Sequence, residues 1–430
     1  MIRRALLAAA ATLALTTPAA AEDFVIVNAT VVIGDGTEPI ENGVLIVDDN
    51  RVTYAGPLAG ARSYATDMVI DAEGKWVTPG LVATLTTLGL SDVSAVSESN
   101  DIRPGNSHWG AALDVAPVIN PSSQHILVHR RAGITRAATV TLPSDSIFGG
   151  QGSIIDLGAD SQPVTKARAF QVVALGERGA SISGGSRAAT YVELAEALRE
   201  AAAYANGRWD AESATLPRAD AEALGAVISG SQPLYVGVER ASDIRSVLRL
   251  KREMPKLDLV LVGASEGWLV ASEIASAGVA VIADGLDDLP GSFEELASTQ
   301  SNVGRMVKAG VRVAINASAM ENPRNLNQYA GNLVALTRIP GADGLSWGQA
   351  FATITSVPAQ ISGLGPQGGQ LAPGAVADVV IWDGDPLEVG SVPTEVFIDG
   401  VRQPMENHQT RLRDRYRDLD ESDQPKAYDW

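Results

Sequence analysis

Four short apolar runs in the second half of the chain constrain its fold more than any other feature. They are LYVGV (234–238), LDLVLVGA (257–264), VAVIAD (279–284) and VRVAIN (311–316), and a helical stretch follows each of them. Apolar runs without polar alternation are typical of strands that are buried on both faces of a parallel sheet. Repeated strand–helix units favour a (β/α) barrel or a doubly wound sheet. No GxGxxG motif follows the first strand, so we expect the barrel.

Two β-rich segments flank this region. Residues 24–57 read as four short strands separated by turns, one of them at Asn42-Gly43, and residues 368–404 form a second β-rich segment. Between 180 and 230 the chain is Ala-rich and helical, which indicates flanking helices or a small insertion. The predicted organisation is a signal peptide over 1–21, a composite β-sandwich domain from 22–78 with 369–404, a barrel over 79–368 and a charged tail over 405–430.

The first 21 residues have the layout of a secretory leader. Arg3 and Arg4 precede the apolar run 5–15, and Ala19-Ala20-Ala21 supplies a small-residue cleavage site. We expect cleavage after Ala21 and a periplasmic or secreted protein, with an uncleaved anchor as the alternative. The chain contains no cysteine, which excludes disulfides and a lipid-modified cysteine.

Charge narrows the possible partners. The formal net charge is −18, and an acidic surface repels phosphate backbones and anionic lipids. No run in the body of the chain reaches the roughly 18 apolar residues that a membrane span needs. We therefore expect neither nucleic-acid binding nor membrane insertion.

Three phrases carry a resemblance to a known family. VNATVVIGDGT and GKWVTPGLV lie near the start, and GQLAPGAVADVVIWDGDP lies near the end. Together they resemble the amidohydrolase superfamily, and more specifically they are similar to its imidazolonepropionase-like branch. The resemblance implies a (β/α)8 TIM-like barrel with a small composite β-sandwich. It also implies hydrolysis of an amide, lactam or related bond by water that a divalent metal activates.

The metal-binding residues that this resemblance implies are missing. Relatives have Pro-Gly-Leu-Ile-Asp-x-His-x-His after the first barrel strand, which aligns here with PGLVATLTT from Pro79. Ala83 stands at the Asp position, and the metal-ligand positions are occupied by Leu85, Thr87, Gly237 on the fifth strand and Ser318 after the eighth. Leucine cannot bind a divalent ion and threonine binds one weakly. We expect no cofactor; a bound metal, if present, would be one divalent ion such as zinc.

Carboxylates after the predicted strands are the remaining candidates for chemistry. Glu239, Glu266 and Asp284 follow the fifth, sixth and seventh strands. If they ring the barrel mouth, a pair could act as acid and base or hold a hard cation. The alternative for Glu239 is a structural role at the start of the next helix.

Two residues are candidates for ligand binding, and two histidines for a metal. His108 lies in a loop that could overhang the mouth, or it packs on Trp109. Gln151 belongs to the phrase SIFGGQG, which we interpret as a tight turn that could contact a ligand. His125 and His129 share a helix face and could bind zinc with a carboxylate, but a structural role is the better interpretation.

Two functional hypotheses remain open. The first is an exported, catalytically degenerate pseudoenzyme that binds a ligand, or that supports an intact paralogous subunit in a homo- or hetero-oligomer. The second is a hydrolase of carbon–nitrogen (non-peptide) bonds with a rebuilt carboxylate site. A purely structural or sugar-binding protein is a third, weaker reading. Apolar packing around Leu85 would fit the first hypothesis, whereas the second requires carboxylates within about 5 Å of one point.

Overall fold

The computed structural model describes residues 22–61, 66, 68–93, 95–316 and 322–417. The predicted signal peptide with its cleavage site after Ala21, Ser318 and the last part of the charged tail (418–430) lie outside the described residues. No helix in the described ranges is long and apolar enough to cross a membrane.

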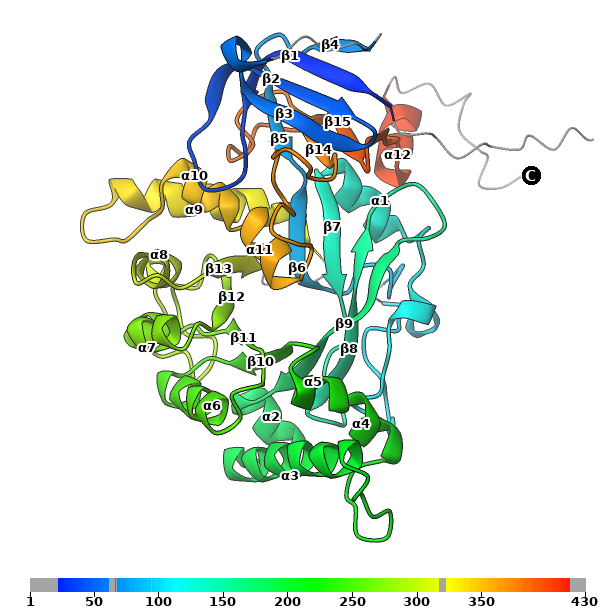
Figure 1. Ribbon diagram of the computed structural model, residues 1–430, viewed down its shortest axis with the longest axis vertical. Coiled ribbons are helices and arrows are strands. Elements are labelled where there is room, and N and C mark those ends of the chain that lie inside the picture. Colours follow the sequence, from blue (N-terminus) through cyan, green and yellow to red (C-terminus); the bar gives the residue numbers. More distant parts are fainter. Residues whose placement is uncertain (1–21, 62–65, 67, 94, 317–321, 418–430) are drawn as a thin grey trace, which may run out of the picture.

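An eight-stranded sheet forms the barrel (Figure 1). Its strands, in order, are β6 (Leu81–Thr86), β7 (Ile134–Thr139), β8 (Phe148–Asp156), β9 (Val164–Ala174), β10 (Leu234–Val238), β11 (Leu259–Gly263), β12 (Ala280–Asp284) and β13 (Val313–Asn316). The side-chain amide of Asn316 in β13 donates to the carbonyl of Leu85 in β6 at 3.4 Å, which brings the sheet close to closure. The barrel prediction is confirmed.

One strand departs from a strict (β/α)8 pattern. β8 is antiparallel to both neighbours, so the SIFGGQG phrase begins a strand and its interpretation as a tight turn is wrong. Glycines explain the difference. Gly150 has a φ of +87°, and a Cβ on Gly152 would lie 2.1 Å from the Phe170 ring, so β8 packs closely against β9 only because side chains are missing here.

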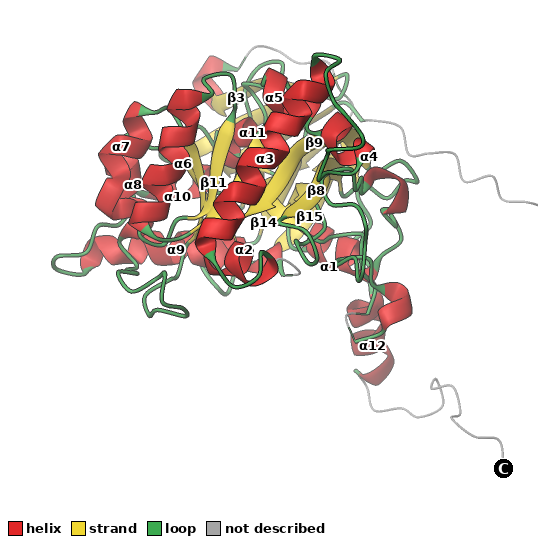
Figure 2. Ribbon diagram, turned by 90° about the horizontal axis from the view of Figure 1, so that it is seen from below, coloured by secondary structure: helices red, strands yellow, loops and turns green. Residues whose placement is uncertain are grey.

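Helices cover the outside of the barrel sheet, and α3 lies across the face seen in Figure 2. They are α1 (Gln124–Arg131), α2 (Gly176–Ile182), α3 (Arg187–Ala205), α4 (Arg218–Ala223), α5 (Gly225–Ser229), α6 (Ala241–Glu253), α7 (Ala271–Ser276), α8 (Asn302–Lys308), α9 (Leu326–Ala335), α10 (Trp347–Ala352) and α11 (Ser356–Ile361), whereas α12 (His408–Tyr416) lies beyond α1 and away from the barrel sheet (Figure 2). An outer apolar layer joins them to the strands. A separate inner cluster, which includes Leu85, Val140, Phe170, Tyr235 and Ile282, fills the barrel.

Strands from both chain ends form a second eight-stranded sheet, the β-domain. It contains β1 (Phe24–Val31), β2 (Ile40–Asp48), β3 (Arg51–Pro57), β4 (Val69–Asp71), β5 (Trp76–Pro79), β14 (Val379–Trp382), β15 (Pro393–Ile398) and β16 (Val401–Arg402). The rings of Phe24 and Phe397 stack 4.5 Å apart in its core. Residues 24–57 form three strands rather than the expected four, because Asn42-Gly43 lies inside β2, where Asn42 has a φ of +50° beside irregular pairing with β1.

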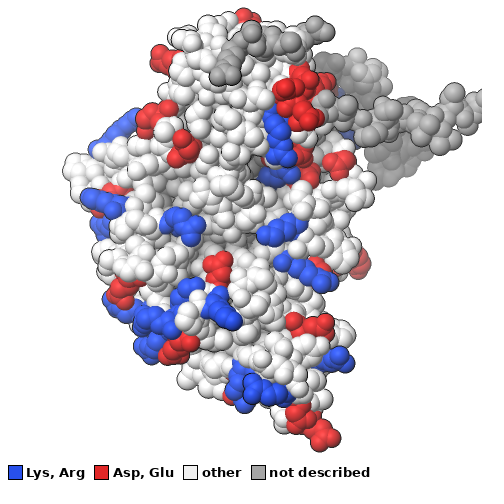
Figure 3. All heavy atoms as spheres, in the orientation of Figure 1, with Lys and Arg blue, Asp and Glu red and all other residues white. Residues whose placement is uncertain are grey.

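Acidic and basic side chains are interspersed over the molecular face in Figure 3. This agrees with the sequence, in which charged residues are spread along the chain rather than gathered in one segment.

Candidate functional site

The parallel barrel strands end at one edge of the sheet, which is where a barrel carries its reactive groups. Three of the positions at which the family resemblance implies metal-site residues lie in the described part of β6 and its turn. Ala83 is fully buried in the outer apolar layer, and Thr87 is 3% exposed. Leu85 is 7% exposed and belongs to the inner cluster that fills the barrel.

Leu85 also has an unusual backbone. Its φ is +51°, a left-handed conformation that costs a side chain other than glycine about 1–3 kcal/mol and that concentrates at functional sites. The fifth-strand position is Gly237, which has no side chain to offer a metal. Among the described residues, no three His, Cys, Asp or Glu side chains group closely enough to hold a metal ion. These residues do not fit the divalent ion that the resemblance implies.

Carboxylates do meet at the mouth, but around a serine. Oε2 of Glu239, after β10, accepts hydrogen bonds from the backbone N–H of Ser265 at 3.0 Å and from its hydroxyl at 2.7 Å. The same hydroxyl lies 3.1 Å from Oδ2 of Asp287, which follows β12. A serine hydroxyl has one hydrogen and can donate to only one carboxylate at a time. The other contact therefore favours a protonated carboxyl, and we name Glu239, Ser265 and Asp287 the carboxylate–serine group.

Electrostatics favours Glu239 as the protonated member. Burial raises the pKa of Glu239 to about 7, which the two hydrogen bonds from Ser265 oppose and the charges of Glu295 and Glu294 reinforce. Gly263 makes room for this side chain, since a Cβ there would lie 1.9 Å from Glu239 Oε1. Burial also raises the pKa of Asp284, whose Oδ1 accepts the backbone N–H of Leu286.

The side chain of Glu266 is not part of the carboxylate–serine group and contacts backbone N–H groups instead. Its Oε2 accepts the backbone N–H of Ala241, the first residue of α6, at 2.9 Å, and its Oε1 accepts that of Ala297 at 3.2 Å. A carboxylate at this place satisfies a free N–H at the start of a helix and interacts with the helix dipole. The structure therefore gives Glu266 a structural role. Of the three carboxylates expected at the mouth, only Glu239 belongs to the carboxylate–serine group.

The segment 285–301, between β12 and α8, links several strand ends. Its Glu294 accepts the backbone N–H of Glu177 at 2.7 Å and pairs with Arg187 at 3.0 Å. A Cβ on Gly176 would lie 2.4 Å from this carboxylate, so the glycine is needed for the contact. Three large apolar side chains of the segment are strongly exposed: Leu289 at 82%, Phe293 at 84% and Leu296 at 65%.

The other candidate residues lie apart from the carboxylate–serine group. His108 is exposed, with its ring 5.9 Å from that of Trp109 in an edge contact, as the structural interpretation predicts. Gln151 is buried in β8, where its Oε1 accepts from Gln232 Nε2 at 3.4 Å. His129 donates from Nδ1 to the carbonyl of His125 at 2.6 Å, and burial lowers its pKa to about 4.

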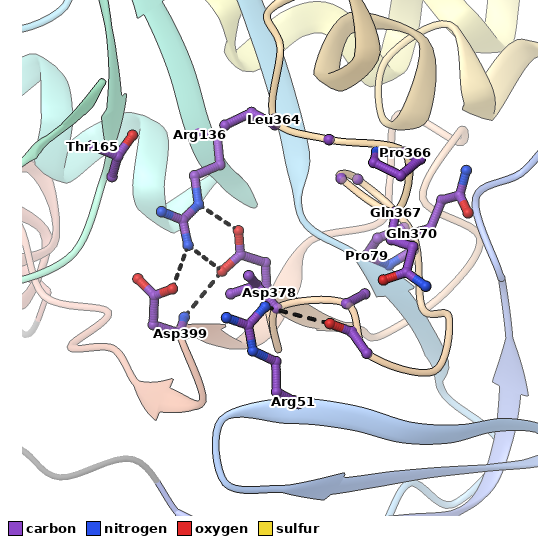
Figure 4. A pocket seen from close by; sticks show the side chains of 16 residues that line it. Arg51, Pro79, Arg136, Thr165, Leu364, Pro366, Gln367, Gln370, Asp378 and Asp399 are labelled. Carbon is purple, nitrogen blue, oxygen red and sulfur yellow. Dashed lines mark hydrogen bonds and ion pairs between the residues drawn. The ribbon is translucent and has the colours of Figure 1, made fainter. Parts of the chain in front are cut away.

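A cavity of about 220 Å³ lies between the barrel and the β-domain (Figure 4). Arg136 of β7 points into it and pairs with both carboxylate oxygens of Asp378, at 2.6 and 2.9 Å, and with Asp399 at 2.7 Å. Arg51 lines the same cavity and donates to the carbonyl of Gly374 at 3.4 Å. The charges of Arg136 and the two aspartates are thus already paired with one another, which indicates that they join the two parts of the fold.

Comparisons with known proteins agree with this architecture. The model of the Amidohydrolase family matches residues 267–402. Amidohydrolase tasK of Hapsidospora irregularis is 24% identical over 85% of this chain, which spans only 39% of that relative's length. Imidazolonepropionase of Acidiphilium cryptum is 25% identical, with 84% of this chain and 93% of the relative aligned.

Solved structures share the fold at low identity. An amidohydrolase from Thermotoga maritima has a TM-score of 0.76 at 21% identity, covering 88% of this chain and 99% of that one. An adenosine deaminase from Xanthomonas campestris, solved with bound zinc, has a TM-score of 0.52 at 17% identity, covering 90% and 93%. These matches show that the chain has the amidohydrolase fold and is similar in sequence to members of the amidohydrolase superfamily.

Proposed function

We propose that this protein is a catalytically degenerate amidohydrolase that acts by binding rather than by metal-dependent hydrolysis. The packing of Leu85 carries the proposal. At the position where relatives bind a metal through histidine, this side chain fills the barrel with Val140, Tyr235 and Ile282. A metal at that point would need a polar ligand in place of an apolar contact.

The binding partner in this proposal is a paralogous subunit or a second copy, with a small ligand as the other possibility. Support comes from the exposed Leu289, Phe293 and Leu296 on the segment 285–301. Apolar side chains gathered at such exposure are typical of protein contact sites. We also propose export through the leader over 1–21, on the basis of its sequence.

Metal content tests the proposal directly. The mature protein, purified without chelator and then incubated with zinc and desalted, is expected to hold less than about 0.1 equivalent of metal by elemental analysis, because the residues that the structure describes contain no ligand set. An intact amidohydrolase taken through the same steps is the control. Retention of about one equivalent or more by this protein would contradict the proposal.

A second function is favoured by the contact between Ser265 and Glu239. In its carboxylate form, which its pKa of about 7 makes available from neutral pH upward, Glu239 lies 2.7 Å from the hydroxyl of Ser265 and could take its proton while Ser265 Oγ attacks the carbonyl of a C–N bond. Glu239 would return the proton to the leaving nitrogen, and water would then cleave the resulting acyl ester. Ser265 is 2% exposed, so a substrate would reach it only after the segment 285–301 moves.

This second function has its own test. If it holds, metal-free protein hydrolyses a member of an amide and lactam panel, and Ser265→Ala reduces kcat by about 100-fold or more. Ser276→Ala is the matched control, because Ser276 is exposed and its hydroxyl, among the residues that the structure describes, bonds only the carbonyl of Ser272. Absence of hydrolysis by the unaltered protein, or activity that survives in Ser265→Ala, would rule out this mechanism.

A further inference from the structure

A cavity of about 340 Å³ beside α1 and the start of α9 differs in charge from the rest of the molecule. Two arginines, Arg131 and Arg324, line it, and no carboxylate is among its described lining residues. The whole chain has 51 Asp and Glu against 33 Lys and Arg. The charged residues that line this cavity are therefore all basic, although acidic residues outnumber basic ones in the chain as a whole.

Both guanidinium groups retain free donors. Arg131 gives one N–H, from Nη1, to the carbonyl of Met405 at 2.8 Å, which fixes its position and leaves its other donors available. The guanidinium of Arg324 has no hydrogen bond or ion pair with any residue that the structure describes. Asp383, next to the lining residue Trp382, has its Oδ1 bonded to the backbone N–H of Val392 at 2.7 Å.

The remaining walls are of two kinds. Asn325, Gln328 and Gln409 add carboxamide groups, which can donate hydrogen bonds to an oxyanion. Val389, Val392 and Pro393 form an apolar part, together with Trp382. The cavity thus combines donors for a charged head group with a surface for a small apolar body.

We propose that this cavity binds a small phosphomonoester with an apolar substituent. Two arginines can balance the two negative charges of a phosphoryl group, and a planar guanidinium matches its oxygens through paired hydrogen bonds. A carboxylate carries only one charge and is the weaker fit. The cavity shares no lining residue with the carboxylate–serine group, so this inference is independent of the proposed function.

Calorimetric titration of the full mature chain with phenyl phosphate tests the proposal. We expect one site per chain, weaker binding of inorganic phosphate, which lacks the apolar body, and weaker binding of benzoate, which has one charge. Arg324→Met is expected to weaken phenyl phosphate binding about 10-fold or more, since it removes charge-assisted hydrogen bonds. Arg131→Met, in α1, provides a second variant and is expected to weaken binding as well.

Arg338→Met is the matched control, because Arg338 is also exposed but does not line the cavity. It is expected to bind phenyl phosphate as the unaltered protein does. No binding by the unaltered protein at about 10 mM phenyl phosphate would overturn the proposal, as would equal affinity in Arg324→Met. Benzoate binding as tight as that of phenyl phosphate would overturn the assignment of a phosphoryl group.

Discussion

Replacing Arg136 with methionine is expected to lower the free energy of unfolding by about 3–5 kcal/mol, the range found when one partner of a buried ion pair is removed. Arg136 is 8% exposed and is the cation between Asp378 and Asp399, with Asp156 at 3.9 Å. Methionine retains the apolar stem but leaves these carboxylates without their counter-charge. Urea unfolding followed by circular dichroism at pH 7 measures the loss.

Arg51→Met is the matched control for this prediction. Arg51 lines the same cavity, but the only described bond of its side chain is to one carbonyl, at 3.4 Å, so a change within about 0.5 kcal/mol is expected. A loss below about 1 kcal/mol, or equal losses in both variants, would show that the ion pairs do not join the barrel to the β-domain.

The barrel could be predicted because its last four strands appear in the sequence as short apolar runs. The run 234–238 coincides with β10, and the runs ending at Asp284 and Asn316 end where β12 and β13 end. The helical stretch expected after the run 234–238 is α6, which begins at Ala241. A strand that is buried on both faces needs apolar residues at consecutive positions, and such a run can be recognised in the sequence before the fold is known.

Glycine-containing phrases were harder to interpret. Gly150 and Gly152 indicated a turn, yet both lie in β8, because Phe170 packs where a side chain of Gly152 would be. Asn42-Gly43 indicated a turn as well and forms an irregular part of β2. Glycine marks either a turn or a close approach, and the second reading depends on a residue far away in the sequence.

The sequence predicted that the candidate site lies at the strand ends, but it did not predict which side chains form the site. Glu239 and Glu266 do follow strand ends, and Asp284 is the last residue of β12, as expected for a barrel mouth. The sequence did not indicate that Glu266 bonds the backbone of Ala241 and Ala297, or that Ser265 lies between two carboxylates. Both arrangements depend on the path of the segment 285–301, which has no periodic pattern.

Glu239→Gln is expected to stabilise the protein at pH 8 by about 2–3 kcal/mol and to have little effect at pH 4.5. The pKa of Glu239 in the folded protein is about 7, above its ordinary value of 4.5. Between these values the unfolded chain loses the proton while the folded chain keeps it, so stability falls as pH rises, and the loss is complete above pH 7. Glutamine stays neutral and avoids this loss.

Glu266→Gln is the control with the opposite sign. Its two carboxylate oxygens accept N–H groups of Ala241 and Ala297, and an amide has only one oxygen, so this variant is expected to lose about 1–2 kcal/mol at pH 8. Urea unfolding of the three proteins from pH 4.5 to 8 makes the comparison. If Glu239→Gln is no more stable than the unaltered protein at pH 8, Glu239 is not the protonated member of the carboxylate–serine group.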